Sequence, residues 1–342
     1  FTIEGSATAT GTVAPIVGEE DDSVQYTLIN GYLKHTDVQD RDATGNFGFN
    51  TEIFQLGGGA TGNQLLTNAP TTQYANINDY GTLSFMTTPK TGDVANTTLD
   101  YFKIKLYDES GSQLGTDIEI ENVDANGGNT TWDLATKNQL LHLGCFPANL
   151  KNWSSIFLAN TTNLSYYLVE AFNISDASIS DRYTIYINCP TLKGYEPIRL
   201  TWLNQWGVWD YYTFKMKSTK SISTKGSTYE QLAGTWNESI YLPNGYKGGK
   251  KAFRVNATEK IVMNTDFVSE SESEWFEELI NSPEVYILKG FQVDATLSSP
   301  NTYVTPARLT TSSFTRKTVA NDKLMQYTFE VEKSKTLRTQ SV

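Results

Sequence analysis

The segment Tyr101-Phe-Lys-Ile-Lys-Leu-Tyr107 alternates between apolar and charged side chains, and it is followed by Asp108-Glu-Ser-Gly-Ser112 and a further segment over 113–121. A period of two is typical of a half-buried β-strand. The residues 108–112 are of the types that favour turns, so 113–121 is predicted to return as the second strand of a hairpin. This is the clearest hairpin in the chain, and it indicates a protein built from half-buried strands.

The composition is that of a folded, acidic β protein. The chain has 342 residues, and 27 basic against 38 acidic side chains give a net charge of 27 − 38 = −11. Its length predicts two or three domains. No apolar run approaches the ~20 residues of a membrane span, so we expect no membrane association. The negative balance argues against a nucleic-acid partner, and we interpret it as solubility before assembly. Because the chain opens at Phe1 without Met or a signal peptide, we expect its true start to be missing.

Three β units are expected along the chain. An N-terminal β domain is predicted over 1–125, and the turn-rich segment 122–131 marks its end. Strands predicted over 165–174 and 183–188 then belong to a unit at 126–194, whose length suits a small immunoglobulin-like sandwich, although the buried Trp and paired-Cys spacing of immunoglobulins is not evident.

The third unit is expected over 195–342 and carries the one helix that we predict. Overlapping Ser-x-x-Glu boxes begin at Ser269, apolar side chains follow at three- and four-residue spacing from Trp275, and Pro283 ends the pattern. A short amphipathic helix is therefore predicted at about 269–281. The Ser/Thr/Lys-rich segment 215–225 indicates a strand end or an exposed arm. The predicted fold class is mainly β, with two or three β-sandwich-like domains and one docked helix.

Catalytic and metal-binding signatures are lacking in the sequence. Two cysteines, Cys145 and Cys189, either form one bridge or remain as two buried thiols. No Cys-x-x-Cys, Gly-x-Ser-x-Gly, Gly-x-Gly-x-x-Gly or Walker-type pattern occurs. We therefore expect no enzyme activity and no cofactor.

Two loops resemble oxygen-rich calcium sites, because Asp and Asn recur at alternate positions before a glycine. Neither loop has the bidentate Glu or the flanking helices of an EF-hand, and Asx-rich turns give the same pattern without metal. We predict no metal site, and the calcium candidates are Asp40, Asp42, Asn122, Asp124, Asn126 and Asp133.

The densest aromatic block lies over 198–214. One interpretation is a platform on which sugar rings stack, and the other is core packing together with a contact between subunits. Side chains alternate along a strand, so these rings cannot all share one face, and a turn at 204–207 would place Trp206 at a loop tip. The interface or glycan-contact candidates are Trp202, Trp206, Trp209, Tyr211 and Tyr212.

Two segments carry a resemblance, Tyr195-Glu-Pro-Ile-Arg-Leu-Thr-Trp-Leu-Asn-Gln-Trp-Gly-Val-Trp-Asp-Tyr-Tyr-Thr-Phe and Trp275-Phe-Glu-Glu-Leu-Ile-Asn-Ser-Pro-Glu-Val-Tyr-Ile. Both resemble segments of β-rich structural proteins of tailed bacteriophages, especially virion and tail-associated proteins of marine and Bacteroidetes-infecting phages. The resemblance covers roughly 195–290, and it is a pattern of aromatics and turns.

The resemblance implies a structural component of a virion that assembles symmetrically with copies of itself and with other virion proteins, in a tail, neck or decorating ring. The alternative is a carbohydrate-binding adhesin or receptor-binding module that contacts a host surface glycan through Trp206–Tyr212. A tail-borne polysaccharide hydrolase is a third reading, and it would need a carboxylate pair in a cleft.

Overall fold

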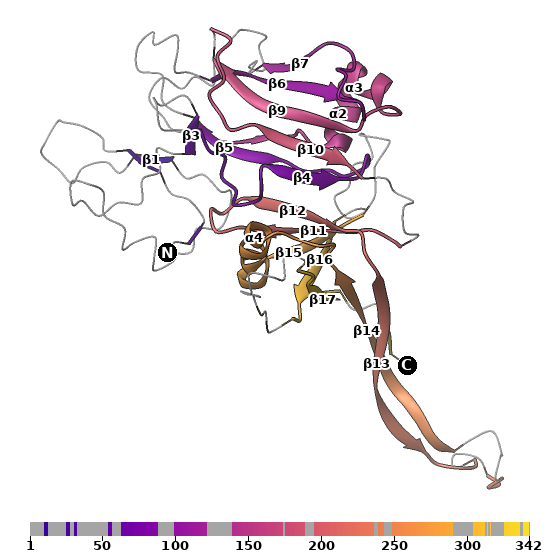
Figure 1. Ribbon diagram of the computed structural model, residues 1–342. Helices are drawn as coiled ribbons and strands as arrows, with labels where there is room; N and C mark the ends of the chain where they lie inside the picture. Colours follow the sequence, from indigo (N-terminus) through magenta and orange to yellow (C-terminus); the bar gives the residue numbers. More distant parts are fainter. Residues whose placement is uncertain are drawn as a thin grey trace, which may run out of the picture.

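The computed structural model describes residues 10–12, 25–27, 31–32, 54–56, 63–87, 99–121, 139–173, 175–188, 195–235, 239–242, 248–289, 304–311, 313, 315, 325–335 and 338–341. The described residues form four sheets and three helices, which confirms the predicted mainly β class. Figure 1 shows two stacked bodies and a long arm. A separate two-stranded sheet pairs β1 (Thr10–Thr12) with β2 (Gln25–Thr27).

The first body begins with a five-stranded sheet in the order β4-β10-β9-β6-β7. The hairpin predicted from the alternation at 101–121 is present, because β6 (Leu99–Tyr107) pairs antiparallel with β7 (Ile118–Glu121). The expected pair further along the chain is present too, as β9 (Tyr166–Asn173) and β10 (Tyr183–Ile187). The remaining strand, β4 (Thr72–Ala75), pairs parallel with β10.

A three-stranded sheet packs against the five-stranded one and completes a sandwich. It consists of β3 (Gln55–Leu56), β5 (Leu83–Thr87) and β8 (Gln139–Leu143). Phe85 of one sheet meets Phe102 of the other, with ring centroids 4.9 Å apart. The two short helices α2 (Pro147–Trp153) and α3 (Ser155–Asn160) bury Leu150 and Phe157 in the same core.

The expected boundary at 125/126 falls within this sandwich. β6 and β7 lie before it and β9 and β10 after it, yet all four belong to one sheet, and the buried residues form one core. The segment 126–194 is therefore not an independent immunoglobulin-like sandwich. The sequence prediction also missed α2 and α3, because each is too short to show a helical repeat of apolar residues. The pairing of β6 with β9 joins distant segments, which local patterns do not reveal.

The second body is an eight-stranded sheet whose strands all come from the segment 195–342. Its order is β12-β11-β15-β16-β17-β14-β13, and β18 pairs with β14. The strands are β11 (Ile198–Leu203), β12 (Trp209–Phe214), β13 (Ser218–Gln231), β14 (Gly249–Asn264), β15 (Val285–Leu288), β16 (Val304–Leu309), β17 (Thr328–Lys333) and β18 (Arg338–Ser341).

The predicted amphipathic helix is α4 (Glu270–Asn281), which packs on this sheet. Ser269 and Glu272 form a complete capping box at its start, so the local signal in the sequence sets the beginning of the helix. Trp275, Phe276 and Leu279 are buried against the sheet. Among the residues described, no helix has the length and apolar character needed to cross a membrane.

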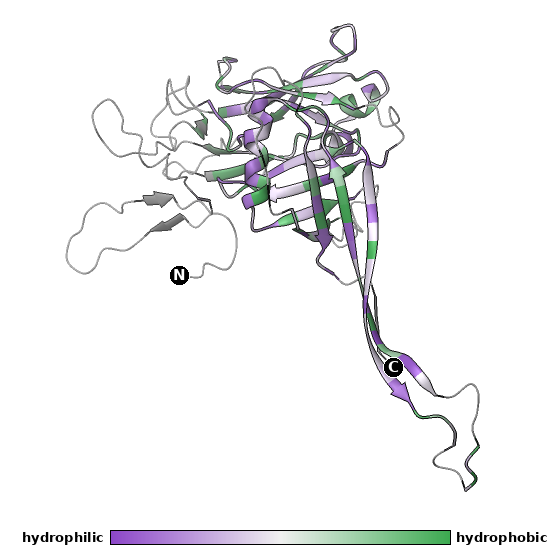
Figure 2. Ribbon diagram, turned by 60° about the horizontal axis from the view of Figure 1, so that its bottom comes forward, coloured by the Kyte–Doolittle hydropathy of each residue, from purple (hydrophilic) through white to green (hydrophobic). Residues whose placement is uncertain are grey.

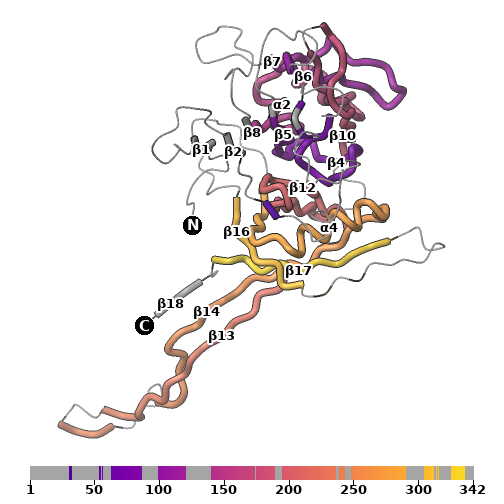
Figure 3. Tube along the Cα trace, turned by 90° about the vertical axis from the view of Figure 1, so that its left-hand side faces the viewer, coloured from indigo at the N-terminus to yellow at the C-terminus, as the bar shows by residue number. Residues whose placement is uncertain are grey.

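The strands β13 and β14 continue beyond the second body as a two-stranded arm (Figures 1 and 3). β13 has 14 residues, and at ~3.3 Å per residue it spans about 45 Å. All of its side chains except those at its two ends are exposed. β13 begins at Ser218, within the segment 215–225 for which the sequence indicated a strand end or an exposed arm.

Candidate functional site

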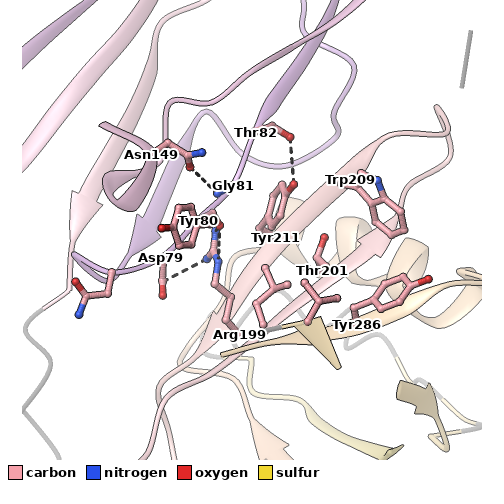
Figure 4. Close-up of a pocket in the computed structure, with 13 residues that line it drawn as sticks. Asp79, Tyr80, Gly81, Thr82, Asn149, Arg199, Thr201, Trp209, Tyr211 and Tyr286 are labelled. Carbon is pink, nitrogen blue, oxygen red and sulfur yellow. Dashed lines mark hydrogen bonds and ion pairs between the residues drawn. The ribbon is translucent and has the colours of Figure 1, made fainter. Parts of the chain in front are cut away.

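A cavity of about 420 Å³ lies where the sandwich meets the eight-stranded sheet (Figure 4). The loop 78–82 and Asn149 of α2 form its sandwich side, and residues of β11, β12, β15 and β16 form the other side. This volume is within the ~300–1,000 Å³ typical of ligand pockets. The junction between the two bodies is therefore a candidate ligand site.

Arg199 of β11 closes one end of the cavity. Its Nε and Nη2 atoms donate to the carbonyl oxygen of Tyr80 at 3.0 and 2.8 Å. Its Nη1 atom donates to Thr213 at 2.8 Å and lies 3.4 Å from the carboxylate of Asp79. A buried charge is tolerated when it is paired and hydrogen-bonded. Arg199 therefore links the sandwich loop to the eight-stranded sheet through its hydrogen bonds to both.

Two neighbouring aromatic rings lie against the guanidinium of Arg199. Its central carbon lies 4.9 Å from the ring centroid of Phe146 and 5.2 Å from that of Tyr211. Gly81 permits this approach, because a Cβ at this position would lie 2.7 Å from the Phe146 ring and 3.0 Å from Nη2 of Arg199. The backbone N–H of Gly81 donates to Oδ1 of Asn149 at 3.0 Å, which fixes α2 against the loop.

The opposite end of the cavity is an aromatic wall. Trp209 and Tyr286 meet edge to face with centroids 5.5 Å apart. The hydroxyl of Tyr211 lies 3.1 Å from Oγ1 of Thr82, and Figure 4 shows this contact beside Trp209. Trp209 and Tyr211 share one face of β12 because they are two residues apart.

The five aromatic residues predicted from the sequence divide between the cavity and the cores. Trp209 and Tyr211 line the cavity. Trp202 is fully buried against Trp275, with centroids 4.9 Å apart, and Tyr212 packs edge to face on Phe276. Trp202 and Tyr212 therefore pack in the core of the second body.

Trp206 lies in the turn expected at 204–207, but its side chain is buried. The turn is present, because the side-chain oxygen of Asn204 accepts from the backbone N–H groups of Trp206 and Val208 at 3.0 and 3.2 Å. The indole, however, is only 6% exposed and packs against Phe54 with centroids 4.6 Å apart. A segment far earlier in the sequence covers it, and the local pattern could not indicate that contact.

Several cavity residues have no signal in the sequence. Asp79, Gly81 and Asn149 come from a loop and a short helix, and Thr201 and Tyr286 come from strands that pair only in the folded sheet. Alternation along 198–203 places Arg199 and Thr201 on one face, but no local pattern indicates what lies opposite. The residues that face Arg199 and Thr201 across the cavity are brought there only when the sandwich packs against the eight-stranded sheet.

A buried polar cluster on the opposite face of β12 also joins the two bodies. The carboxylate of Asp210 accepts from Nε1 of Trp275 at 2.7 Å and from the hydroxyl of Thr67 at 2.7 Å. Burial raises the pKa of Asp210 to about 6. Beside it, Glu278 of α4 accepts from the side chain of Asn68. These contacts attach the segment 66–69 to β12 and to α4.

The structure does not test the calcium candidates from the sequence. Asp40, Asp42, Asn122, Asp124, Asn126 and Asp133 all lie outside the described residues, and within the described ranges no group of three or more His, Cys, Asp and Glu residues could hold a metal ion. Cys145 is a free thiol, and burial raises its pKa to about 12. Cys189 lies outside the described residues.

Comparisons of the chain with protein-family models, with curated proteins and with solved structures each gave no match.

Proposed function

We propose that this chain is a structural protein that assembles with copies of itself, and that the β13–β14 arm of one copy docks on the body of the next. The observation that carries the proposal is the arm itself, which extends away from both bodies (Figure 3). At 14 and 16 residues its strands are far longer than the 5–6 residues usual in globular proteins. A feature of this size that contributes little to the core of its own chain needs another role.

The charge of the arm is opposite to that of the rest of the chain. The exposed arm segments 222–231 and 249–258 carry four basic residues and one acidic residue, which gives 4 − 1 = +3. The whole chain carries −11, so the remainder carries −11 − 3 = −14. Complementary charges steer association and favour the matching partner. The most direct partner of a basic arm is therefore the acidic body of a second copy. The arm residues counted are Lys225, Lys250, Lys251, Arg254 and Glu230.

Figure 2 shows hydrophobic stretches along the ribbon of the same arm. Of the fifteen large hydrophobic residues that are exposed among those described, eight lie on the arm or at its tip. A concentration of this kind marks a protein interaction surface. The arm is also at the edge of the sheet, so β13 presents a long row of backbone groups to a further strand. The eight residues are Ile222, Tyr229, Leu232, Ile240, Tyr241, Leu242, Phe253 and Val255.

The setting that we propose is the virion of a tailed bacteriophage. The support is the resemblance of 195–214 and 275–287 to structural proteins of such phages, together with an arm suited to joining subunits. In a closed ring each copy both donates its arm and receives one, which is a heterologous contact. Other virion proteins would contact the outer faces of the ring.

The proposal is tested by shortening the arm. Residues 223–258 are replaced by Asn-Gly, so that the register partners Ile222 and Glu259 flank a two-residue turn. The mass of each protein is then measured by sedimentation over a range of concentrations. We expect the full chain to form larger species as its concentration rises, and the shortened chain to remain monomeric.

A charge-reversed variant separates docking from folding. Lys225, Lys250 and Lys251 are changed together to Glu, and the matched control changes the same residues to Arg. Because all three side chains are exposed, both variants should fold, but only the Glu variant should lose assembly. The proposal would be overturned if the full chain remained monomeric at high concentration and no partner were recovered with it from virions. A shortened chain that assembles normally would also overturn it.

A further inference from the structure

We propose that the cavity between the two bodies binds a neutral, hydroxyl-rich ligand of the size of a sugar ring. This proposal does not depend on the assembly function, because the arm and the cavity share no residue. Three properties of the cavity support it: the state of its charged groups, a buried hydroxyl without a partner, and its aromatic wall.

The charged groups of the cavity are already used within the protein. Of the described residues that line it, only Asp79 and Arg199 are charged. Oδ2 of Asp79 accepts from Thr213 at 2.8 Å and from the backbone N–H of Asn76 at 2.8 Å, and it also faces Arg199. Arg199 in turn donates twice to the carbonyl of Tyr80. A charged ligand would find no unpaired counter-charge here, so the cavity favours a neutral one.

The hydroxyl of Thr201 requires a partner that the chain does not supply. The residue is 5% exposed, and its Oγ1 atom is buried without a hydrogen-bond partner among the described residues. Thr201 lies between Arg199 and the aromatic wall, and in Figure 4 it is drawn among the side chains that line the cavity. An unsatisfied buried hydroxyl is destabilising. Because Thr201 lines the cavity, a change of its χ1 rotamer would turn the hydroxyl toward a ligand hydroxyl, which would satisfy it.

The aromatic wall suits the apolar face of a sugar ring. Trp209 and Tyr286 form its sides, and Leu288 and Val304 extend the apolar surface. The C–H groups on one face of a sugar pack well on aromatic rings, while its hydroxyls point to polar groups at the edge. Asn149 is such a group, because its Oδ1 is used by Gly81 and its amide nitrogen is a further donor. A purely apolar ligand would leave Thr201 unsatisfied.

The test titrates the full chain with glucose, galactose, mannose and N-acetylglucosamine, and with glucuronate as the charged counterpart, by calorimetry and by ligand-observed NMR. We expect at least one neutral sugar to bind, and glucuronate to bind more weakly than glucose. Thr201→Val and Trp209→Ala should each weaken binding about tenfold or more. Phe267→Ala is the control, because Phe267 is exposed and does not line the cavity.

Thermal unfolding of the free variants distinguishes a loss of sugar binding from a loss of folding. Thr201→Val removes an unsatisfied hydroxyl and keeps the shape of the side chain, so it should raise the Tm of the free protein while it weakens sugar binding. The proposal is overturned if none of the neutral sugars binds at millimolar concentration. It is also overturned if Thr201→Val and Trp209→Ala bind as tightly as the Phe267→Ala control, or if glucuronate binds best.

Discussion

Replacing Asp210 by Asn should change how the stability of the protein depends on pH. The carboxyl group is buried between Thr67 and Trp275, and burial raises its pKa from 3.8 to about 6. Between these two values the folded protein holds a proton that the unfolded chain has lost. The free energy of unfolding must therefore fall as the pH rises through this window. The shift is about 2 units, and at 1.36 kcal/mol per unit it corresponds to about 3 kcal/mol.

In Asp210→Asn this contribution is absent. The amide oxygen can accept from Nε1 of Trp275, and the amide nitrogen can donate to the hydroxyl of Thr67, so these two contacts are kept. Urea unfolding of both proteins, followed by Trp fluorescence at several pH values between about 4 and 7, gives the difference in stability at each pH. The effects of titrating groups that do not interact with Asp210 cancel in that difference. We expect the wild-type protein to lose about 3 kcal/mol relative to the variant as the pH rises.

The control is Asp176, whose pKa is shifted the other way. Its carboxylate is hydrogen-bonded by Lys103 and Tyr101, and these bonds lower its pKa. A lowered carboxyl pKa gives stability that is present above the unfolded pKa and is lost as the pH falls. Asp176→Asn should therefore produce a small change of opposite sign. A wild-type minus Asp210→Asn difference that is flat, or that rises with pH, would refute the assignment of Asp210 as a carboxyl held protonated by burial.

Two substitutions test other parts of the fold. Gly81→Ala should destabilise the protein by about 1–3 kcal/mol, because the Cβ of the alanine would overlap the Phe146 ring. Thermal unfolding measures this change, and an unchanged Tm would mean that the loop 78–82 can move away from Arg199. Ser269→Ala removes the capping box of α4 and should cost about 1 kcal/mol. Chemical denaturation checks it with Ser227→Ala, exposed on the arm, as the control, and equal effects of both would contradict the capping role.

Local patterns in the sequence were sufficient for the elements that local interactions determine. The alternation at 101–107 predicted β6, and the Ser-x-x-Glu boxes with the apolar spacing after Ser269 predicted α4, because strand alternation and helix capping each depend on residues close in sequence. The polar segment 215–225 indicated a strand end or an exposed arm, because its composition gives a strand no apolar face to bury. These predictions depend little on contacts with distant parts of the sequence.

The arrangement of the two bodies could not be predicted from such patterns. The strand β4 pairs parallel with β10 across more than a hundred residues, and no turn signal connects them. The same holds for Trp206, which Phe54 covers, and for Arg199, which meets the loop of Tyr80 only after the sandwich docks on the sheet. In each case the deciding contact joins residues far apart in sequence, so the residue types alone left core, interface and ligand contact as open alternatives.

The two proposals depend on different surfaces, and this makes them separable. The arm leaves the second body through β13 and β14, whereas the cavity uses β11, β12, β15 and β16 of the same sheet together with the sandwich loop. Variants at Lys225 or Lys251 should therefore change assembly and leave sugar binding intact, and variants at Thr201 should do the reverse. If a sugar instead altered assembly, the eight-stranded sheet would have to transmit the effect, and β14 pairs directly with β17 in that path. The order of strands thus predicts where coupling between the two sites would have to pass.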